Sequence, residues 1–519
     1  MHRCWKVPEL TSTIFKQLGD RPDGAWEALC ALARTCRAFS EPALDLLWKE
    51  QASLVPLLKC LPSGTWQDDG EVFVGHYSLL RRFVFDGSQE ICSLLHPAHW
   101  DRVVLHSRRI KAFGFCDSDI GYSTVNESTM RIILMSFPLA HVLPNVRSVR
   151  IFTSSVHFPY SRLLFGPLLA EFYITVEARS LAVSALARLA DWPSLTHFDL
   201  DTCTNGVDHD VALTIVISSY IQAAPFNSLE TLSIQYLSPS ACRHLASLPR
   251  LKSLTIERLH GTSFRDIHSL QQGRWFPKLD TLFLYATHLM YATNFLQAIQ
   301  TTPLRRLFVS ARGCSRDEFR SCLSAVQHQT SLTFLKIDLR RHLRPPPLPV
   351  ILTAKDLTPL LSLPQIRTLS FLTSDGISFD DSFGNAMSLA WPQIKTVELG
   401  DSRTHRDPNR VSPTTETLVS FARNCPHLEG LTLRFDLTGL SVDSASPACV
   451  RQMTLKAVDF DGSHIDEPLV LAKILSSLFP ALRSVRSPPN SEPWGKVKEL
   501  VAAFAVVRED ERRFMNGGN

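Results

Sequence analysis

The chain has 519 residues, with 54 Lys and Arg against 50 Asp and Glu, so its formal net charge at pH 7 is only +4. A charge this close to neutral argues against bulk electrostatic capture of nucleic acid or of an anionic membrane surface. Hydrophobic residues make up 45% of the chain and charged residues 20%, which is the composition of a folded protein and not of a disordered one. At about 150 residues per domain, this length suggests three or four domains.

The sequence predicts no export signal and no membrane span. Charged residues interrupt the apolar ones throughout Met1–Leu18, so the continuous apolar core of a signal peptide is missing. The apolar runs stop at about eight residues, as in Leu500–Val507, whereas a spanning helix needs about 20. The 12 cysteines form no C-x-x-C pair and no regular framework, which is typical of reduced, buried thiols. We therefore expect a cytoplasmic or nuclear protein.

Between residues 7 and 48 the sequence predicts three short helices. In the first, Leu10, Ile14 and Leu18 share one helical face, and Phe15 lies beside them. Pro8 falls near the first turn, where its missing backbone N–H costs least. The next two helices carry further apolar residues: Leu29, Leu32, Ala33, Cys36, Leu44, Leu47 and Trp48. Three helices of this size cannot bury so much apolar surface among themselves, so we expect the module to pack against another part of the chain or a partner.

This stretch resembles an F-box. The motif positions read Val7-Pro8-Glu9, Ile14-Phe15-Lys16-Gln17-Leu18, Thr35-Cys36-Arg37-Ala38-Phe39 and Leu47-Trp48. The sequence departs from the family pattern at two positions, with Val7 in place of Leu and Phe39 in place of Trp. F-boxes dock onto the Skp adaptor of cullin-RING ubiquitin ligases. The resemblance implies docking here through Pro8, Leu10, Ile14, Phe15, Leu18 and Leu47. Some of these residues could instead hold the three helices together.

After this module one pattern recurs along most of the chain. It consists of an apolar residue, two variable residues, a second apolar residue, one variable residue and a third apolar residue, usually just after a proline. Its clearest copies start at Leu195, Leu251, Leu279 and Leu428. Further copies start at Val146, Leu229, Leu304, Leu332, Ile366, Ile394 and Leu482, and weaker ones at Leu80, Ile110, Leu169 and Leu455. The steps between starts average about 29 residues, which indicates a repeat architecture.

The spacing predicts one strand per repeat, because the second and third apolar residues are two apart and point to the same side of a strand. Helical stripes lie between the strands, and Ser315-Arg316-Asp317-Glu318 opens one of them as a capping box. Such units bury their apolar faces by stacking on their neighbours. The stretch from about residue 70 to 487 resembles the leucine-rich repeat family. The resemblance implies an α/β horseshoe solenoid with parallel strands on the concave face and helices on the convex face.

We expect three regions: residues 1–55 as the F-box module, 56–487 as the leucine-rich-repeat solenoid, and 488–519 as a linker with a capping helix. Lys496–Phe514 is predicted to be that helix, because a terminal repeat needs a polar outer face. Arg340–Pro349 contains a P-x-x-P register, which a proline-binding module could dock as polyproline II. A stiff loop between repeats is the plainer interpretation.

No nucleotide-binding, zinc-protease or nucleophile-elbow motif occurs in the sequence, so we predict no catalytic residue. Asp-x-Asp pairs recur at Asp117/Asp119, Asp199/Asp201, Asp208/Asp210 and Asp459/Asp461. Their oxygens could hold a metal, but solvent-facing carboxylates explain them more simply, so no metal and no cofactor are expected. His96 and His99 lack further ligands at a suitable spacing and indicate a helix end or a loop.

In this register, the positions two, four and six residues after the first apolar residue point into the concave face. Three neighbouring repeats then bring aromatic and basic side chains together: Phe283, Tyr285, Arg306, Phe308, Phe334 and Lys336. Exposed aromatics beside cations are typical of an interface hot spot, so we predict a protein substrate site here. Asp199, Asp201 and Glu257 provide acidic positions one or two repeats away. The plainer interpretation is that strands favour aromatic residues.

These expectations describe a substrate-recognition subunit of an SCF-type E3 ubiquitin ligase that performs no bond chemistry itself. The F-box would bind the Skp adaptor, and through it a cullin, while the repeats would bind a protein substrate. The alternative is a non-catalytic leucine-rich-repeat scaffold or regulatory binding protein that acts outside a ligase. An enzyme in its own right has no motif in support.

Overall fold

The chain divides into two compact units, Met1–Gln235 and Tyr236–Asn519. Both are built around parallel strands that follow one another in chain order. The described part of the chain contains no helix that is both long and apolar enough to cross a membrane. The computed structural model describes the chain except residues 1–7, 20–24, 69–73, 76–82, 85–87, 92–94, 115–123, 153–157, 177–191, 203–210, 225, 236, 260–274, 313, 340–350, 374–375, 402–409, 441–449, 461, 487–491 and 517–519.

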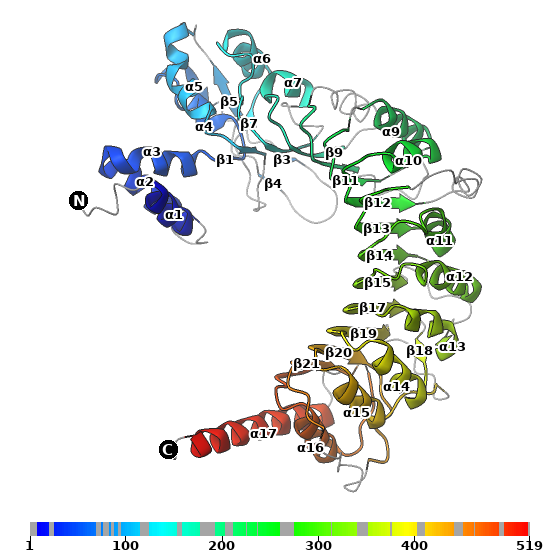
Figure 1. The fold of residues 1–519 in the computed structure, drawn as a ribbon. Helices are drawn as coiled ribbons and strands as arrows, with labels where there is room; N and C mark the ends of the chain where they lie inside the picture. Colours follow the sequence, from blue (N-terminus) through cyan, green and yellow to red (C-terminus); the bar gives the residue numbers. More distant parts are fainter. Residues whose placement is uncertain are drawn as a thin grey trace. The chain divides into compact units, whose positions relative to one another are not determined.

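The first unit begins with three helices and continues into a parallel sheet (Figure 1). The three helices are α1 (Pro8–Gly19), α2 (Ala25–Thr35) and α3 (Arg37–Leu47). The sheet strands are β1 (Glu50–Gln51), β6 (Ala112–Phe113), β8 (Ser148–Phe152), β9 (Glu171–Val176), β10 (His197–Thr202) and β11 (Thr231–Ile234). Later helices are α4 (Val55–Leu58), α5 (Asp101–Ser107), α6 (Glu127–Ser136), α7 (Ser161–Leu164) and α9 (Val211–Ala223). The same unit contains two small sheets. One has the order β2 (Trp66–Asp68), β5 (Ser88–Ile91) and β7 (Thr124–Val125), and the other pairs β3 (Val74–Gly75) with β4 (Phe83–Val84).

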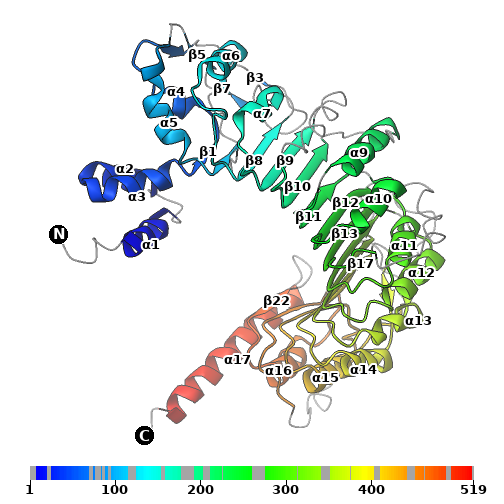
Figure 2. The same ribbon diagram turned by 45° about the horizontal axis from the view of Figure 1, so that its top comes forward.

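In the second unit, helices α11 to α15 line one face of the strands in both views (Figures 1 and 2). The strands are β12 (Ser253–Leu259), β13 (Thr281–Ala286), β14 (Arg306–Ala311), β15 (Phe334–Leu339), β17 (Thr368–Thr373), β19 (Thr396–Asp401), β20 (Gly430–Leu433), β21 (Ala457–Asp459) and β22 (Ser484–Arg486). The helices are α10 (Pro239–Ala246), α11 (Leu289–Ala298), α12 (Arg316–Val326), α13 (Ala354–Leu357), α14 (Asp381–Ala390), α15 (Thr415–Asn424), α16 (Pro468–Leu478) and α17 (Glu492–Asn516). A separate parallel pair joins β16 (Leu352–Thr353) to β18 (Ile377–Ser378).

In the second unit each strand of the large sheet starts two residues after the first apolar residue of a repeat motif. In the repeat of β13, Leu279, Leu282 and Leu284 are fully buried, and the strand starts two residues after Leu279. The main-chain oxygen of Asp280 accepts hydrogen bonds from the N–H groups of the next repeat, at 2.9 Å from Arg305 and 3.0 Å from the residue after it. The same ladder continues through the later repeats of this unit. The predicted α/β solenoid of stacked leucine-rich repeats is therefore confirmed.

Buried glutamine side chains tie neighbouring repeats together just before two of the strands, β15 and β21. The Gln329 side chain donates to the carbonyl oxygen of Ile299 at 3.4 Å and accepts from the N–H of Leu304 at 3.3 Å. Gln452 likewise donates to the carbonyl oxygen of Leu428 at 2.8 Å and accepts from the N–H of Leu455 at the same distance. These bonds satisfy backbone groups that burial removes from water.

Two details of the predicted repeat register are wrong. The strand expected after Leu80, which itself lies outside the described residues, does not join the large sheet. β4 instead pairs antiparallel with β3 in a two-stranded sheet. The repeat sheet also begins earlier than predicted, because β1 pairs with β6 through Gln51 and Phe113. The P-x-x-P segment Arg340–Pro349 lies outside the described residues.

The predicted helix signals are confirmed at both places where they are most specific. At the start of α12, the Ser315 hydroxyl accepts from the N–H of Glu318 at 3.2 Å, and the glutamate accepts from the N–H of Ser315 at 2.8 Å. The C-terminal helix α17 covers the end of the repeats. Its Trp494 indole donates to the carbonyl oxygen of Ser463 at 3.1 Å, and Val497 is fully buried.

Candidate functional site

The three N-terminal helices pack on one small apolar core. Phe15 of α1, Leu29 of α2 and Ala43 of α3 form this core and are at most 4% exposed. The rings of Phe15 and Phe39 meet edge to face with their centroids 5.6 Å apart. Phe15 is therefore a core residue of the module in this structure. It packs under the neighbouring apolar side chains and is not exposed on the surface.

Other apolar side chains of the module remain accessible. Ile14 on α1 is 37% exposed and Trp26 on α2 is 57% exposed, while Leu18 and Leu47 are half-buried against the core. Pro8 and Leu10 also lie in α1, but their side chains are outside the described part of the chain. Among the residues predicted to bind an adaptor, Ile14 is the most accessible one that the structure describes.

An arginine with a largely covered side chain joins the helical module to the first repeat. The guanidinium of Arg109, whose side chain is 9% exposed, bonds Glu41 at 2.5 Å and also Asp45, both on α3. Burial lowers the pKa of Arg109, but the hydrogen bond to Glu41 and the charge of Asp45 raise it more, so the net direction is upward. The module is thereby tied to the turn that follows α5. Sequence reasoning missed Arg109, because a single arginine in a turn belongs to no motif.

On the strand face of the second unit, the six residues predicted to form a substrate site lie together. Phe283 of β13 is the register partner of Phe308 in β14, and Phe308 is the partner of Lys336 in β15. The Phe308 ring centroid is 6.0 Å from that of Phe283 and 5.1 Å from that of Tyr285. Arg306 lies beside Phe334 in the same way. We call Phe283, Tyr285, Arg306, Phe308, Phe334 and Lys336 the strand-face cluster.

Cation–π contacts orient the two basic side chains of the strand-face cluster. The guanidinium carbon of Arg306 lies 5.0 Å from the Phe334 ring centroid, and the Lys336 ammonium lies 6.0 Å from the Phe308 centroid. Tyr285 is 40% exposed, and burial, followed by the charge of Glu257, raises the pKa of its hydroxyl. The tyrosine therefore stays a neutral hydrogen-bond donor. The cluster offers aromatic faces, two cations and one hydroxyl to a partner.

The Asp-x-Asp pairs are not part of a metal-binding cluster in the described part of the chain. No group of three or more His, Cys, Asp or Glu side chains with metal-binding geometry occurs there. Asp201 accepts a hydrogen bond from Gln235 at 3.0 Å. Burial raises the pKa of Asp199, and a hydrogen bond from Ser233 opposes this shift. The pairs at Asp117/Asp119 and Asp208/Asp210 lie outside the described residues.

The two histidines near residue 100 lie at a helix end, which is one of the two expected alternatives. The His96 ring accepts from the N–H of Ala98 at 3.3 Å, and the His99 ring accepts from the N–H of His96 at 3.3 Å. They cap the 3-10 helix Pro97–Trp100. The histidine pair therefore has a structural role.

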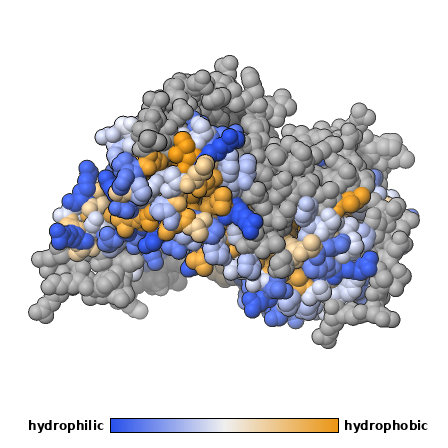
Figure 3. Space-filling view, turned by 90° about the horizontal axis from the view of Figure 1, so that it is seen from above, coloured by the Kyte–Doolittle hydropathy of each residue, from blue (hydrophilic) through white to orange (hydrophobic). Residues whose placement is uncertain are grey.

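Exposed apolar side chains gather on the helices of the first unit (Figure 3). Met135 on α6 is 89% exposed, Leu105 on α5 is 52% exposed and Leu163 on α7 is 48% exposed. Exposed apolar side chains gathered in this way mark a contact surface more often than isolated ones do. The first unit thus presents a candidate contact area in addition to the helical module.

No protein-family model and no curated protein matches the sequence. Among solved structures, the chain is similar to a crystal structure of the Rad7 and Elc1 complex in yeast, with 13% identity and a TM-score of 0.32 over 88% of this chain and 89% of that one. It is also similar to the leucine-rich repeat-containing protein LegL7 from Legionella pneumophila, with 13% identity and a TM-score of 0.24 over 71% of this chain and 93% of that one. Likenesses at this level carry no functional argument, so the repeat assignment rests on the strand spacing and register.

Proposed function

We propose that this chain is the substrate-recognition subunit of an SCF-type E3 ubiquitin ligase. Its three-helix module would bind the Skp adaptor, and through it a cullin, and its strand face would bind a protein substrate. The observation that carries the proposal is the contact between the three-helix module and the first repeat. An F-box-like module packs on its own core and is bonded by Glu41 and Asp45 to Arg109 at the first repeat.

This arrangement suits a subunit that works by proximity. A receptor of this kind supplies no bond chemistry and instead holds the substrate near a ubiquitin-charged enzyme, which raises the effective concentration of the reacting groups. A fixed connection between the adaptor-binding module and the first repeat preserves that geometry better than a free linker would. The Arg109 contacts and the ring contact between Trp48 and His106 provide such a connection within the first unit.

Adaptor binding is best tested with point variants. Deletion of residues 1–55 would also remove β1 and the partners of Arg109, and so damage the first repeat. We expect Ile14→Asp to abolish co-purification of the Skp adaptor, because a charge would replace an exposed apolar contact. Lys16→Asp, on the opposite side of α1, is the control and should leave adaptor binding intact. Equal adaptor recovery with the wild-type chain and with Ile14→Asp would rule out this interface.

The cullin content of the complex separates the two candidate functions. A ligase subunit should bring a cullin with the adaptor in wild-type co-purifications and lose both in Ile14→Asp. A scaffold that acts outside a ligase would bring the adaptor without a cullin. The absence of catalytic motifs from the sequence fits both.

Substrate binding is tested on the strand-face cluster. Ile14→Asp provides the background, because captured substrates would then be held without being degraded. We expect Phe308→Ala to lose the proteins that this background enriches, since Phe308 contacts three other members of the cluster. Thr432→Ala, at the equivalent strand position of β20, is the control. Enriched proteins that bind Phe308→Ala and Thr432→Ala equally would place the substrate site elsewhere.

A further inference from the structure

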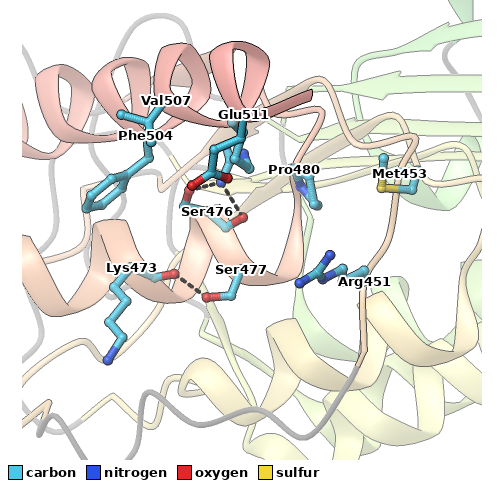
Figure 4. A pocket seen from close by; sticks show the side chains of 10 residues that line it. Arg451, Met453, Lys473, Ser476, Ser477, Pro480, Phe504, Val507 and Glu511 are labelled. Carbon is cyan, nitrogen blue, oxygen red and sulfur yellow. Dashed lines mark hydrogen bonds between the residues drawn. The ribbon is translucent and has the colours of Figure 1, made fainter. Parts of the chain in front are cut away.

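The C-terminal end of the second unit contains a pocket of about 620 Å³ between α16 and α17 (Figure 4). The last turns of α16 form one wall through Lys473 and Ser476, and the second half of α17 forms the other through Phe504 and Val507. The chain before β21 closes a third side with Arg451 and Met453. The pocket is distinct from both surfaces discussed above.

The helix α17 is held at two points, which makes the pocket a fixed feature. Near its start, Val497 and Val501 are buried and Trp494 bonds Ser463. Further along, the guanidinium of Arg508 donates to the carbonyl oxygen of Ser476 at 2.8 Å, in the last turn of α16, where helix carbonyls lack intrahelical partners. These contacts brace both walls.

The lining of the pocket combines apolar surface with an excess of positive charge. Val507 is 54% exposed and Met453 is 52% exposed, so both present apolar surface to a ligand. The lining contains three cationic side chains, Arg451, Lys473 and Arg508, and one carboxylate, Glu511. Arg508 bonds Ser476, whereas Arg451 and Lys473 are exposed and form no ion pair with any described residue. An apolar ligand with negative charge would complement this lining.

We propose that this pocket binds an acidic peptide segment of a partner protein, with a large apolar side chain next to carboxylates. The apolar side chain would lie against Phe504 and Val507, and the carboxylates would pair with Arg451 and Lys473. The volume suits a few peptide side chains. The proposal does not depend on the ligase assignment, since it uses residues of the terminal cap alone.

The test uses fluorescence anisotropy with the full chain and two labelled peptides. The first is Gly-Ser-Asp-Glu-Leu-Phe-Glu-Asp-Ser-Gly, and the second replaces each acidic residue by its amide. We expect the acidic peptide to bind at least about tenfold more tightly than the amide peptide. Added salt should weaken the binding of the acidic peptide. Failure of the acidic peptide to bind at about 1 mM, or equal binding of the two peptides, would overturn the proposal.

Matched variants locate the binding. Lys473→Glu and Val507→Asp should each weaken the acidic peptide about tenfold, because both place negative charge in the pocket. Lys498→Glu and Val506→Asp make the same changes at exposed positions of α17 outside the pocket and should leave the affinity unchanged. Circular dichroism checks that all four variants keep their helices. Equal losses from the pocket variants and their controls would show that the peptide binds elsewhere.

Discussion

The indole of Trp48 stacks on the imidazole of His106, with ring centroids 4.4 Å apart and planes inclined by 19°. Trp48 follows α3 and His106 lies in α5, so the contact joins the helical module to a helix of the first repeat. Burial lowers the pKa of His106, and the charges of Arg109 and Arg102 lower it further. The histidine is therefore neutral at pH 7 in the folded first unit.

The first prediction concerns the pH dependence of this contact. Because the folded-state pKa of His106 lies below the ordinary value near 6.5, the unfolded chain takes up the proton first on acidification. The stabilisation is complete above about pH 6.5 and is lost as the pH falls toward the folded-state pKa. Thermal unfolding is followed by tryptophan fluorescence between about pH 5.5 and 7.5. As the pH falls, the melting temperature should drop more steeply in the wild type than in His106→Gln. An equal dependence of the melting temperature on pH in both chains would contradict the lowered pKa of His106.

The second prediction concerns the arginine that ties the module to the repeats. Arg109→Ala removes the bonds to Glu41 and Asp45, whose side chains are 69% and 64% exposed. Water screens such carboxylates, so we expect a loss of about 1 kcal/mol in the free energy of unfolding from urea titration. Limited proteolysis should also cut faster between α3 and α5. Arg108→Ala, at the exposed neighbouring residue, is the control and should change neither measurement.

Much of the fold could be predicted because each repeat carries its own local signal. Every predicted strand but the one after Leu80 joins the large sheet, two residues after the first apolar residue of its motif. The first strand could not be predicted, since Gln51 and Ser53 occupy positions where the motif has apolar residues. Its place in the sheet comes from pairing with β6, about 60 residues later in the chain, and no local pattern encodes such a contact.

The strand-face cluster could be predicted from local sequence patterns, whereas the role of Phe15 and the pocket between α16 and α17 could not. Phe283 and Phe308 could be placed side by side because both stand four residues after the first apolar residue of consecutive repeats. The burial of Phe15 could not be separated from adaptor contact, since one amphipathic pattern describes both. The pocket beside Arg508 depends on how α17 packs on α16, which the spacing within either helix does not determine.

The third prediction concerns a buried carboxylate behind the sheet. Asp356 accepts from Arg316 at 2.7 Å, from Arg320 at 2.6 Å and from the N–H of Thr353 at 2.8 Å, and its side chain is fully buried. Burial alone would raise the pKa of Asp356, but these hydrogen bonds outweigh it and hold the pKa well below its ordinary range. Asp356→Asn should lower the free energy of unfolding at pH 7 by about 2 to 3 kcal/mol, because the arginines lose their charged partner.

The carboxylate of Asp356 also makes the stability of the fold depend on pH. Because the folded-state pKa of Asp356 is lowered, its stabilisation is present above about pH 4 and is lost as the pH falls below that value. Urea titrations give the free energy of unfolding at about pH 7 and at about pH 3.5. Between these two pH values the free energy of unfolding should fall less for Asp356→Asn than for the wild type. Asp317→Asn, at a side chain that is 94% exposed on α12, should follow the wild type. A drop of the same size in all three chains would show that Asp356 is not ionised in the fold.

The fourth prediction tests the close packing of α14 on α15. A Cβ atom at Gly384 would lie 2.2 Å from the Thr417 hydroxyl oxygen, and that hydroxyl donates to Asp381 at 2.7 Å. Gly384→Ala should therefore lower the free energy of unfolding by about 1 to 3 kcal/mol, although alanine favours a helix by about 1 kcal/mol. Gly495→Ala is the matched control in α17, where no atom lies within 4 Å of the new methyl group, so the helix preference should stabilise the chain. Stabilisation by both substitutions in urea titrations would mean that α14 and α15 pack less closely than described.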